Sequence, residues 1–83
     1  MKVNVKYFAS IRESIGTGSE PLDTTAATLG ALRDELIARG GAHAESLARG
    51  RAVRVALNQV MSDEATPLSE GAEIAFFPPV TGG

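Results

Sequence analysis

The sequence predicts a two-layer α+β domain, in which one main helix packs across one face of a mixed sheet of four or five strands. Two segments, residues 2–7 and 73–77, alternate polar and apolar side chains with the two-residue period of a strand. Between them, residues 29–37 carry apolar side chains at helical spacing. Because a crossover through that helix separates the first strand from the last, these two strands can lie side by side as parallel neighbours.

The N-terminal segment predicts a hairpin. In "MKVNVKYFA", Val3, Val5 and Tyr7 share one face, and Phe8 falls on the opposite, polar side. "SIRESIGTGS" is typical of a helical turn followed by a glycine-containing loop. "EPLDTT" then predicts a short second strand, which Pro21 restricts to a sheet edge or to the first position because proline lacks a backbone donor.

Residues 28–41 predict the main helix. Its apolar stripe at i, i+3, i+7 and i+8 consists of Leu29, Leu32, Leu36 and Ile37. Thr28 is the expected N-cap, and Gly40-Gly41 is the expected end of the helix. "AHAESLARG" indicates a short second helix.

The second half of the chain predicts three short strands. "RAVRVALNQVMS" directs Val53, Val55 and Leu57 inward, and a tight turn at Asn58-Gln59 leads into a short strand that contains Met61. In "AEIAFFPP", the side chains of Ile74 and Phe76 face the core, whereas Phe77 faces outward.

Composition excludes several kinds of site. The chain has no cysteine, which excludes a disulfide framework, a thiolate metal site and a cysteine nucleophile. His43 is the single histidine, and a surface or capping role is expected for it. A net charge of -2 without a long basic run argues against nucleic acid as a partner. The alternating N-terminus and the absence of a long apolar run predict a soluble, cytoplasmic protein without a membrane partner.

The remaining charged clusters are interpreted as solvated surface, and neither a metal site nor a bound cofactor is expected. The acidic pairs Asp34-Glu35 and Asp63-Glu64 consist of neighbours whose side chains need not converge. The arginines of the second half flank and alternate with a strand, and they are Arg49, Arg51 and Arg54.

Three apolar side chains are predicted on the outer face of the sheet. They are Phe8 on the first strand, Met61 on the short strand and Phe77 on the last. If the first and last strands pair, these side chains form an apolar patch, and large exposed patches mark surfaces that bind partners. In the alternative, a loop or the second helix covers them.

The closing run "PPVTGG" predicts an extended tail, residues 79–83, that follows a domain of residues 1–78. The tail consists of Pro79, Val80, Thr81, Gly82 and Gly83. The prolines favour an extended course away from the fold, and the valine and threonine can pack or hydrogen-bond in a groove of a partner. The glycines have no side chain, so the end can enter a narrow channel. A frayed terminus is the alternative.

Four segments together resemble a known family. They are "VKYFASIRESIG", "ALNQ", "PLSEGAEIAFFPP" and the closing "AFFPPVTGG". Over essentially the whole chain, they resemble the small, sulfur-carrying subunits of molybdopterin synthase, which have the ubiquitin-like β-grasp fold. One departure is Met61, which stands where a branched aliphatic residue is more common in that family.

The resemblance implies that Gly83 carries the chemistry. An adenylating enzyme, similar to ubiquitin-activating enzymes, would use ATP to convert the Gly83 carboxylate into an acyl-adenylate. A persulfide from a cysteine desulfurase or rhodanese-type donor would then supply sulfur and leave a thiocarboxylate. The tail would insert into the large synthase subunit, within a heterotetramer, and donate sulfur to cyclic pyranopterin monophosphate. The catalytic residues would belong to the large subunit, and Phe8, Met61 and Phe77 would form the docking surface.

Three other functions fit parts of the pattern. Sulfur carriers for thiamine synthesis or tRNA thiolation share the terminal Gly-Gly but usually lack "FFPPV" before it. A protein modifier joined to lysines would use the same activated end. A plain interaction module with a frayed tail would not need an activated end.

Overall fold

The computed structural model describes residues 1–78 and contains, within that range, five strands and three helices. In chain order these are β1 (Lys2–Tyr7), α1 (Ala9–Ile15), β2 (Ser19–Asp23), α2 (Leu29–Ile37), α3 (Gly41–Leu47), β3 (Arg54–Leu57), β4 (Val60–Ser62) and β5 (Glu73–Phe77). The strands form one sheet in the order β2-β1-β5-β3-β4. β1 and β5 are parallel, and the other neighbours are antiparallel. The predicted α+β architecture and the pairing of first and last strands are confirmed.

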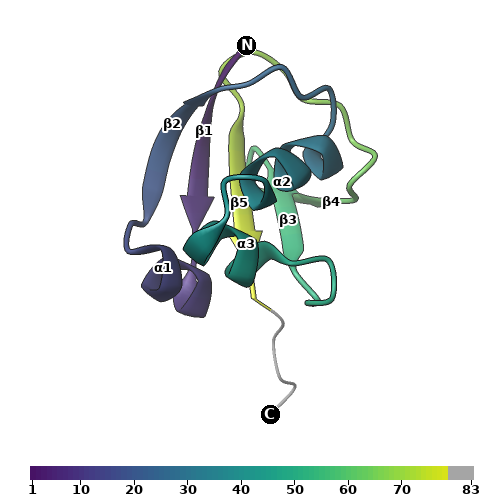
Figure 1. Cartoon of the computed structure of the whole chain (residues 1–83). Helices are drawn as coiled ribbons and strands as arrows, with labels where there is room; N and C mark the ends of the chain where they lie inside the picture. Colours follow the sequence, from purple (N-terminus) through teal and green to yellow (C-terminus); the bar gives the residue numbers. More distant parts are fainter. Residues whose placement is uncertain (79–83) are drawn as a thin grey trace.

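The helices gather on one side of the sheet, where the core forms. Figure 1 shows α2 and α3 in front of the sheet, α1 near the end where β5 finishes, and the N-terminus at the opposite end. The sheet contributes buried side chains from alternate positions, including Val5, Tyr7, Ile74 and Phe76. They pack against Leu29, Leu32, Leu36 and Leu47 of the helices, which are fully buried. Apolar burial of this kind stabilises the fold by about 1.5–3 kcal/mol per large side chain.

Local signals explain most element boundaries. The Thr28 hydroxyl accepts a hydrogen bond from the Ala31 amide at 3.1 Å, so the predicted N-cap of α2 is confirmed. α2 ends at Ile37 with Ala38 as its C-cap, before the expected end at Gly40-Gly41, and Gly41 is the first residue of α3. At the β3–β4 turn, Asn58 and Gln59 both have positive φ angles, 49° and 70°, which suits the two-residue turn of a right-twisted hairpin.

A buried arginine ties the helices to two loops. Arg33 of α2 is 4% exposed. Its Nε donates to the Leu47 carbonyl at 2.8 Å, and its Nη2 donates to the carbonyls of Ala48 at 2.7 Å and Arg51 at 3.1 Å. Its Nη1 donates to Glu64 Oε2 at 2.7 Å. One planar guanidinium therefore donates hydrogen bonds to carbonyl groups at the end of α3 and in the segment before β3, and to a carboxylate beyond β4.

Asp34, Asp63 and Arg49 are exposed, as the interpretation of a solvated surface predicts, but that interpretation missed the contacts that join Arg49 to acidic residues. Arg49 donates to Asp34 at 2.9 Å and to the Gly30 carbonyl at 2.9 Å, and it also pairs with Glu64. Glu35 accepts a hydrogen bond from the Thr24 hydroxyl at 2.6 Å. The physical reason is that the loop after α3 brings Arg49 over α2, a proximity between residues that are distant in the sequence.

These pairs make stability depend on pH through Glu64. Hydrogen bonds from Arg49 and Arg33 hold the pKa of the Glu64 carboxyl below its ordinary value. A depressed pKa contributes stability that is present above the unfolded-state pKa and is lost as the pH falls through the folded-state pKa. We expect Glu64→Gln to destabilise the protein at about pH 7 and to have little effect at about pH 3. Urea unfolding of both proteins at the two pH values measures this, and an equal loss at both would contradict it.

Candidate functional site

The parallel pairing of β1 and β5 brings two aromatic side chains together at one end of the sheet. Tyr7 lies opposite Phe76 in register, so the next residues, Phe8 and Phe77, emerge side by side on the outer face. The Phe8 amide donates to the Phe76 carbonyl at 3.2 Å. The two outer rings are stacked, with centroids 4.6 Å apart and planes 12° from parallel. Phe8 is 39% exposed, so no loop or helix of the described chain covers it.

Met61 belongs to the same face, two strands away from Phe77. It lies opposite Ala56 on β3, which in turn lies opposite Ala75 on β5. Both alanines are buried, whereas Met61 is 54% exposed. Phe8, Phe77, Ala75, Ala56 and Met61 therefore share one face of the sheet, with Phe8 and Met61 the most exposed among them, and we call this set the outer-face patch. Alternation along these strands also directs Ala56 and Ala75 outward, and small residues at outward positions of central strands are the signal for the low centre of the patch.

Charged side chains border the outer-face patch. Lys6 forms an ion pair with Glu73 at 3.4 Å on the side of β1. Arg54 lies opposite Phe77 in the register of β3 with β5 and is exposed. Within residues 1–78, Arg54 makes no ion pair or side-chain hydrogen bond. An apolar centre with a charged border is the usual composition of a surface that binds another protein.

The predicted tail begins where the outer-face patch ends. β5 finishes at Phe77, and Pro78 is half-buried directly after it. The tail predictions for Pro79, Val80, Thr81, Gly82 and Gly83 lie outside the described residues. The described structure thus shows the root of the tail, held at the same end of the sheet as the stacked phenylalanines.

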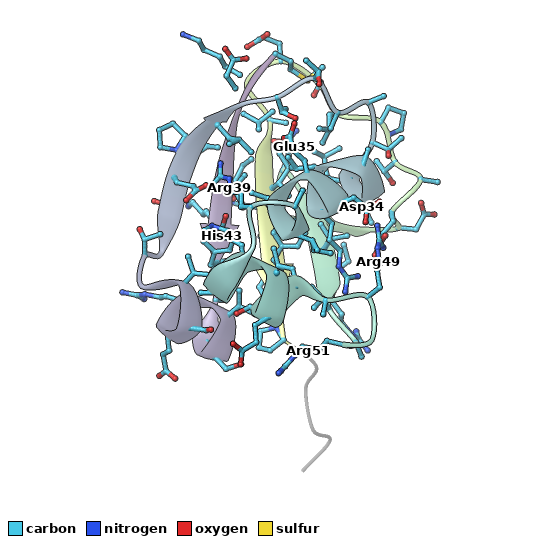
Figure 2. The ribbon with its side chains drawn as sticks, viewed as in Figure 1. Asp34, Glu35, Arg39, His43, Arg49 and Arg51 are labelled. Atoms are coloured by element: carbon cyan, nitrogen blue, oxygen red, sulfur yellow. The ribbon has the colours of Figure 1, made fainter. Side chains whose placement is uncertain are left out.

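His43 lies on the helix side of the sheet, away from the outer-face patch. Its ring packs edge-on against Tyr7 with centroids 5.9 Å apart, and its Nε2 lies 3.8 Å from a Glu20 carboxylate oxygen. Arg39 lies beside it (Figure 2) and pairs with the same carboxylate. Burial and the nearby Glu20 raise the pKa of the Tyr7 hydroxyl, so the phenol stays protonated. Through these contacts His43 packs α3 against β1 and β2, so its role is structural.

Residues 1–78 contain no group of three or more histidine, cysteine or acidic side chains arranged to hold a metal ion. In the same range, every helix is too short or too polar to span a membrane.

The chain is similar to sulfur carrier proteins over its whole length. The model of the ThiS family matches residues 5–83. The molybdopterin synthase sulfur carrier subunit of Haemophilus influenzae is 42% identical over 81 residues, which cover 98% of this chain and 99% of the relative. The protein of the same name from Escherichia coli is 38% identical with the same coverage.

Solved structures with the same fold include two relevant neighbours. SAMP1 from Haloferax volcanii superposes with a TM-score of 0.79 at 27% identity, and each chain is covered completely. A chain from the protein–protein complex of subunits 1 and 2 of the molybdopterin-converting factor from Helicobacter pylori has a TM-score of 0.70 at 31% identity, again with complete coverage of both chains. The ubiquitin-like β-grasp prediction is confirmed, and the chain belongs to the ThiS family, with molybdopterin synthase sulfur carrier subunits among its full-length relatives.

Proposed function

We propose that this chain is the sulfur carrier subunit of a molybdopterin synthase. The observation that supports it most is the full-length similarity to two proteins of that name, at 42% and 38% identity. The geometry agrees, because an exposed apolar patch lies at the root of a tail that ends in two glycines. A carrier needs these two features: a surface that docks, and a thin end that enters the partner.

The chemistry of the proposal takes place at the Gly83 carboxylate. A carboxylate is a poor electrophile, and adenylation by ATP, with loss of pyrophosphate, supplies a good leaving group. A persulfide sulfur then attacks the carbonyl carbon and releases AMP, and cleavage of the sulfur–sulfur bond by a thiol leaves the thiocarboxylate. The chain itself has no cysteine, so the transferred sulfur resides on the terminus. The adenylating enzyme uses the ATP, and a cysteine desulfurase or rhodanese-type protein supplies the persulfide.

The partner that accepts the sulfur is the large synthase subunit. The Helicobacter pylori neighbour comes from a complex of two converting-factor subunits, which supports a complex of this kind here. We infer that the large subunit contributes the catalytic residues and the site for cyclic pyranopterin monophosphate. Two carriers and two large subunits would form the heterotetramer, and two sulfur transfers would complete the dithiolene.

Intact-mass measurement combined with reconstitution tests this function. The chain is incubated with an adenylating enzyme, ATP and a sulfur donor, and a gain of about 16 Da marks replacement of one oxygen by sulfur. The product is then mixed with a large subunit and the pterin precursor. We expect dithiolene product and return of the chain to its original mass. A chain that gains sulfur but yields no product with any large subunit would instead be a carrier for thiamine synthesis or tRNA thiolation.

A protein modifier is the second candidate, favoured by the fold similarity to SAMP1 and to two structures called small archaeal modifier protein 1. The same activated carboxylate would then form isopeptide bonds with lysines. Mass analysis of the protein from its own cells separates the two functions, because conjugation produces a series of high-mass adducts, whereas sulfur transfer does not.

The outer-face patch should control binding to the large subunit. We expect Met61→Asp to weaken the complex by about tenfold or more, since a carboxylate in an apolar interface loses its hydration. The matched control is Val60→Asp, because Val60 is 65% exposed on the same strand but alternates to the other face. Calorimetric titration measures both affinities, and circular dichroism checks folding. Equal weakening by the two substitutions would contradict a role for this face.

A further inference from the structure

A groove lies beside the root of the tail, on the helix side of the sheet. It encloses about 420 Å³ between α1, α3 and the segment that leads into β3. Its walls include Ser10 and Ser14 from α1, Ser46 from α3, and Arg51 and Val53 from the loop. Pro78, the last described residue before the tail, completes the lining. We call this cavity the root groove.

The root groove has polar groups without partners. Ser46 also lines the groove, and among the contacts of residues 1–78 its hydroxyl forms no hydrogen bond, although this oxygen is not cut off from solvent. A hydroxyl on the wall of an open groove can donate a hydrogen bond to a bound group. The guanidinium of Arg51 is exposed and, within the same part of the chain, forms no ion pair.

The fold fixes the position of Arg51. Its amide donates to the Ala48 carbonyl at 2.9 Å, and its carbonyl accepts hydrogen bonds from the Val53 amide at 2.9 Å and from Arg33 at 3.1 Å. The loop backbone is therefore held, and its guanidinium is presented beside the base of the tail, as Figure 2 shows. A pre-positioned cation with nearby hydroxyl donors suits a carboxylate. Apolar floor is supplied by Ile11 and Val53.

The root groove and the outer-face patch lie on opposite sides of the same tail root. Pro78 lines the groove, and its neighbour Phe77 belongs to the patch. Because Phe77 and Pro78 are adjacent in the chain, a protein that covers the patch at Phe77 also reaches the edge of the groove at Pro78.

We propose that the root groove binds a segment of the large synthase subunit that carries an aspartate or glutamate next to an apolar side chain. The carboxylate pairs with Arg51 and accepts hydrogen bonds from the serine hydroxyls, among them Ser46. The apolar neighbour packs on Ile11 and Val53. This inference rests on the proposed function, since it assigns the groove to the partner that accepts the tail. Glu45 is also in the lining and repels a carboxylate, so the acidic side chain must bind on the Arg51 side of the groove.

Charge reversal at Arg51 tests the proposal. The affinity of the full chain for the large subunit is measured by calorimetric titration for wild type, Arg51→Glu, Ser46→Ala and Lys2→Glu. Lys2→Glu is the matched control, because it makes the same charge change on an exposed side chain at the end of the domain opposite the tail (Figure 1). We expect Arg51→Glu to weaken binding by about tenfold or more and Ser46→Ala by a few-fold, with wild-type affinity for Lys2→Glu. Thermal unfolding confirms that each variant is folded.

The outcomes distinguish a failure of the groove proposal from a failure of the proposed function. If Arg51→Glu and Lys2→Glu bind alike, the groove is not part of the interface and the proposal fails. If Arg51→Glu weakens binding to the adenylating enzyme but not to the large subunit, the assigned partner is wrong. Absence of transfer by the wild type would overturn the proposed function instead, and the binding comparison would still decide the groove.

Discussion

Deletion of Gly83 should reduce sulfur transfer to the pterin precursor below detection and leave thermal unfolding unchanged. The proposed reactive atom is the terminal carbonyl carbon, and removal of one residue withdraws it by up to about 3.5 Å from its place in each partner. A misplacement of about 1 Å can already cost about a hundredfold in rate. Stability should not change, because the buried core lies within residues 1–78. Thiocarboxylate formation by intact mass, product formation and a thermal melt measure the three properties.

Two further variants test whether this result depends on the position of the terminal carboxylate. A variant with one alanine added after Gly83 moves the carboxylate outward by one residue and should be equally inactive. Thr81→Ser keeps the length and the hydroxyl and should retain most of the activity. An extended variant that still supplies sulfur, and whose mass shows that the extra residue has not been removed, would overturn the assignment of Gly83.

Replacement of Arg33 by methionine should cause the largest loss of stability among single charged-residue substitutions. Arg33 is 4% exposed and donates to three backbone carbonyls and to Glu64. Methionine fills similar space but leaves those carbonyls without a donor, at about 1–3 kcal/mol for each one that water does not reach. We expect a total loss of about 2–4 kcal/mol, which is a large part of the stability of a small domain. Urea unfolding measures it.

Two substitutions serve as controls for Arg33→Met. Arg33→Lys keeps the charge, but a single ammonium cannot match the planar fork that reaches three carbonyls, so most of the loss should remain. Arg54→Met removes an exposed arginine that has no ion pair within residues 1–78, and it should change stability by less than about 0.5 kcal/mol. Similar losses for Arg33→Met and Arg54→Met would show that the buried hydrogen bonds do not stabilise the fold.

Arg33 also illustrates where prediction from the sequence stopped. On the helix, its i−4, i+3 and i+4 neighbours are Leu29, Leu36 and Ile37 of the apolar stripe, so the local pattern places it beside the buried face but does not indicate its hydrogen-bond partners. Its partners, from Leu47 to Glu64, are 14 to 31 residues away in the chain. The contacts of the exposed Arg49 with Asp34 and Glu64 were not predicted for the same reason. Which charged side chains are buried depends on how separate loops meet, and this is not encoded in a local period.

The outer-face patch was partly predictable. Alternation along β1 and β5 placed Phe8 and Phe77 outward, since side-chain direction in a strand is set by position alone. Their ring stacking depends on the parallel register, and the low centre of the patch depends on Ala56 and Ala75 meeting across β3 and β5. The root groove was not predicted at all, because its lining comes from α1, α3, a loop and the end of β5.

By itself, the sequence determined the elements and their buried faces, because the periods of strands and helices are local properties of the chain. It also determined the chemistry available, through the absence of cysteine and the run that ends in Gly82-Gly83. Only the tertiary structure decided which side chains from distant segments meet: the Arg33 hydrogen bonds, the residues of the outer-face patch and the groove at the tail root. Those contacts form when the sheet and helices pack, and their partners are separated by distances along the chain that no local pattern can record.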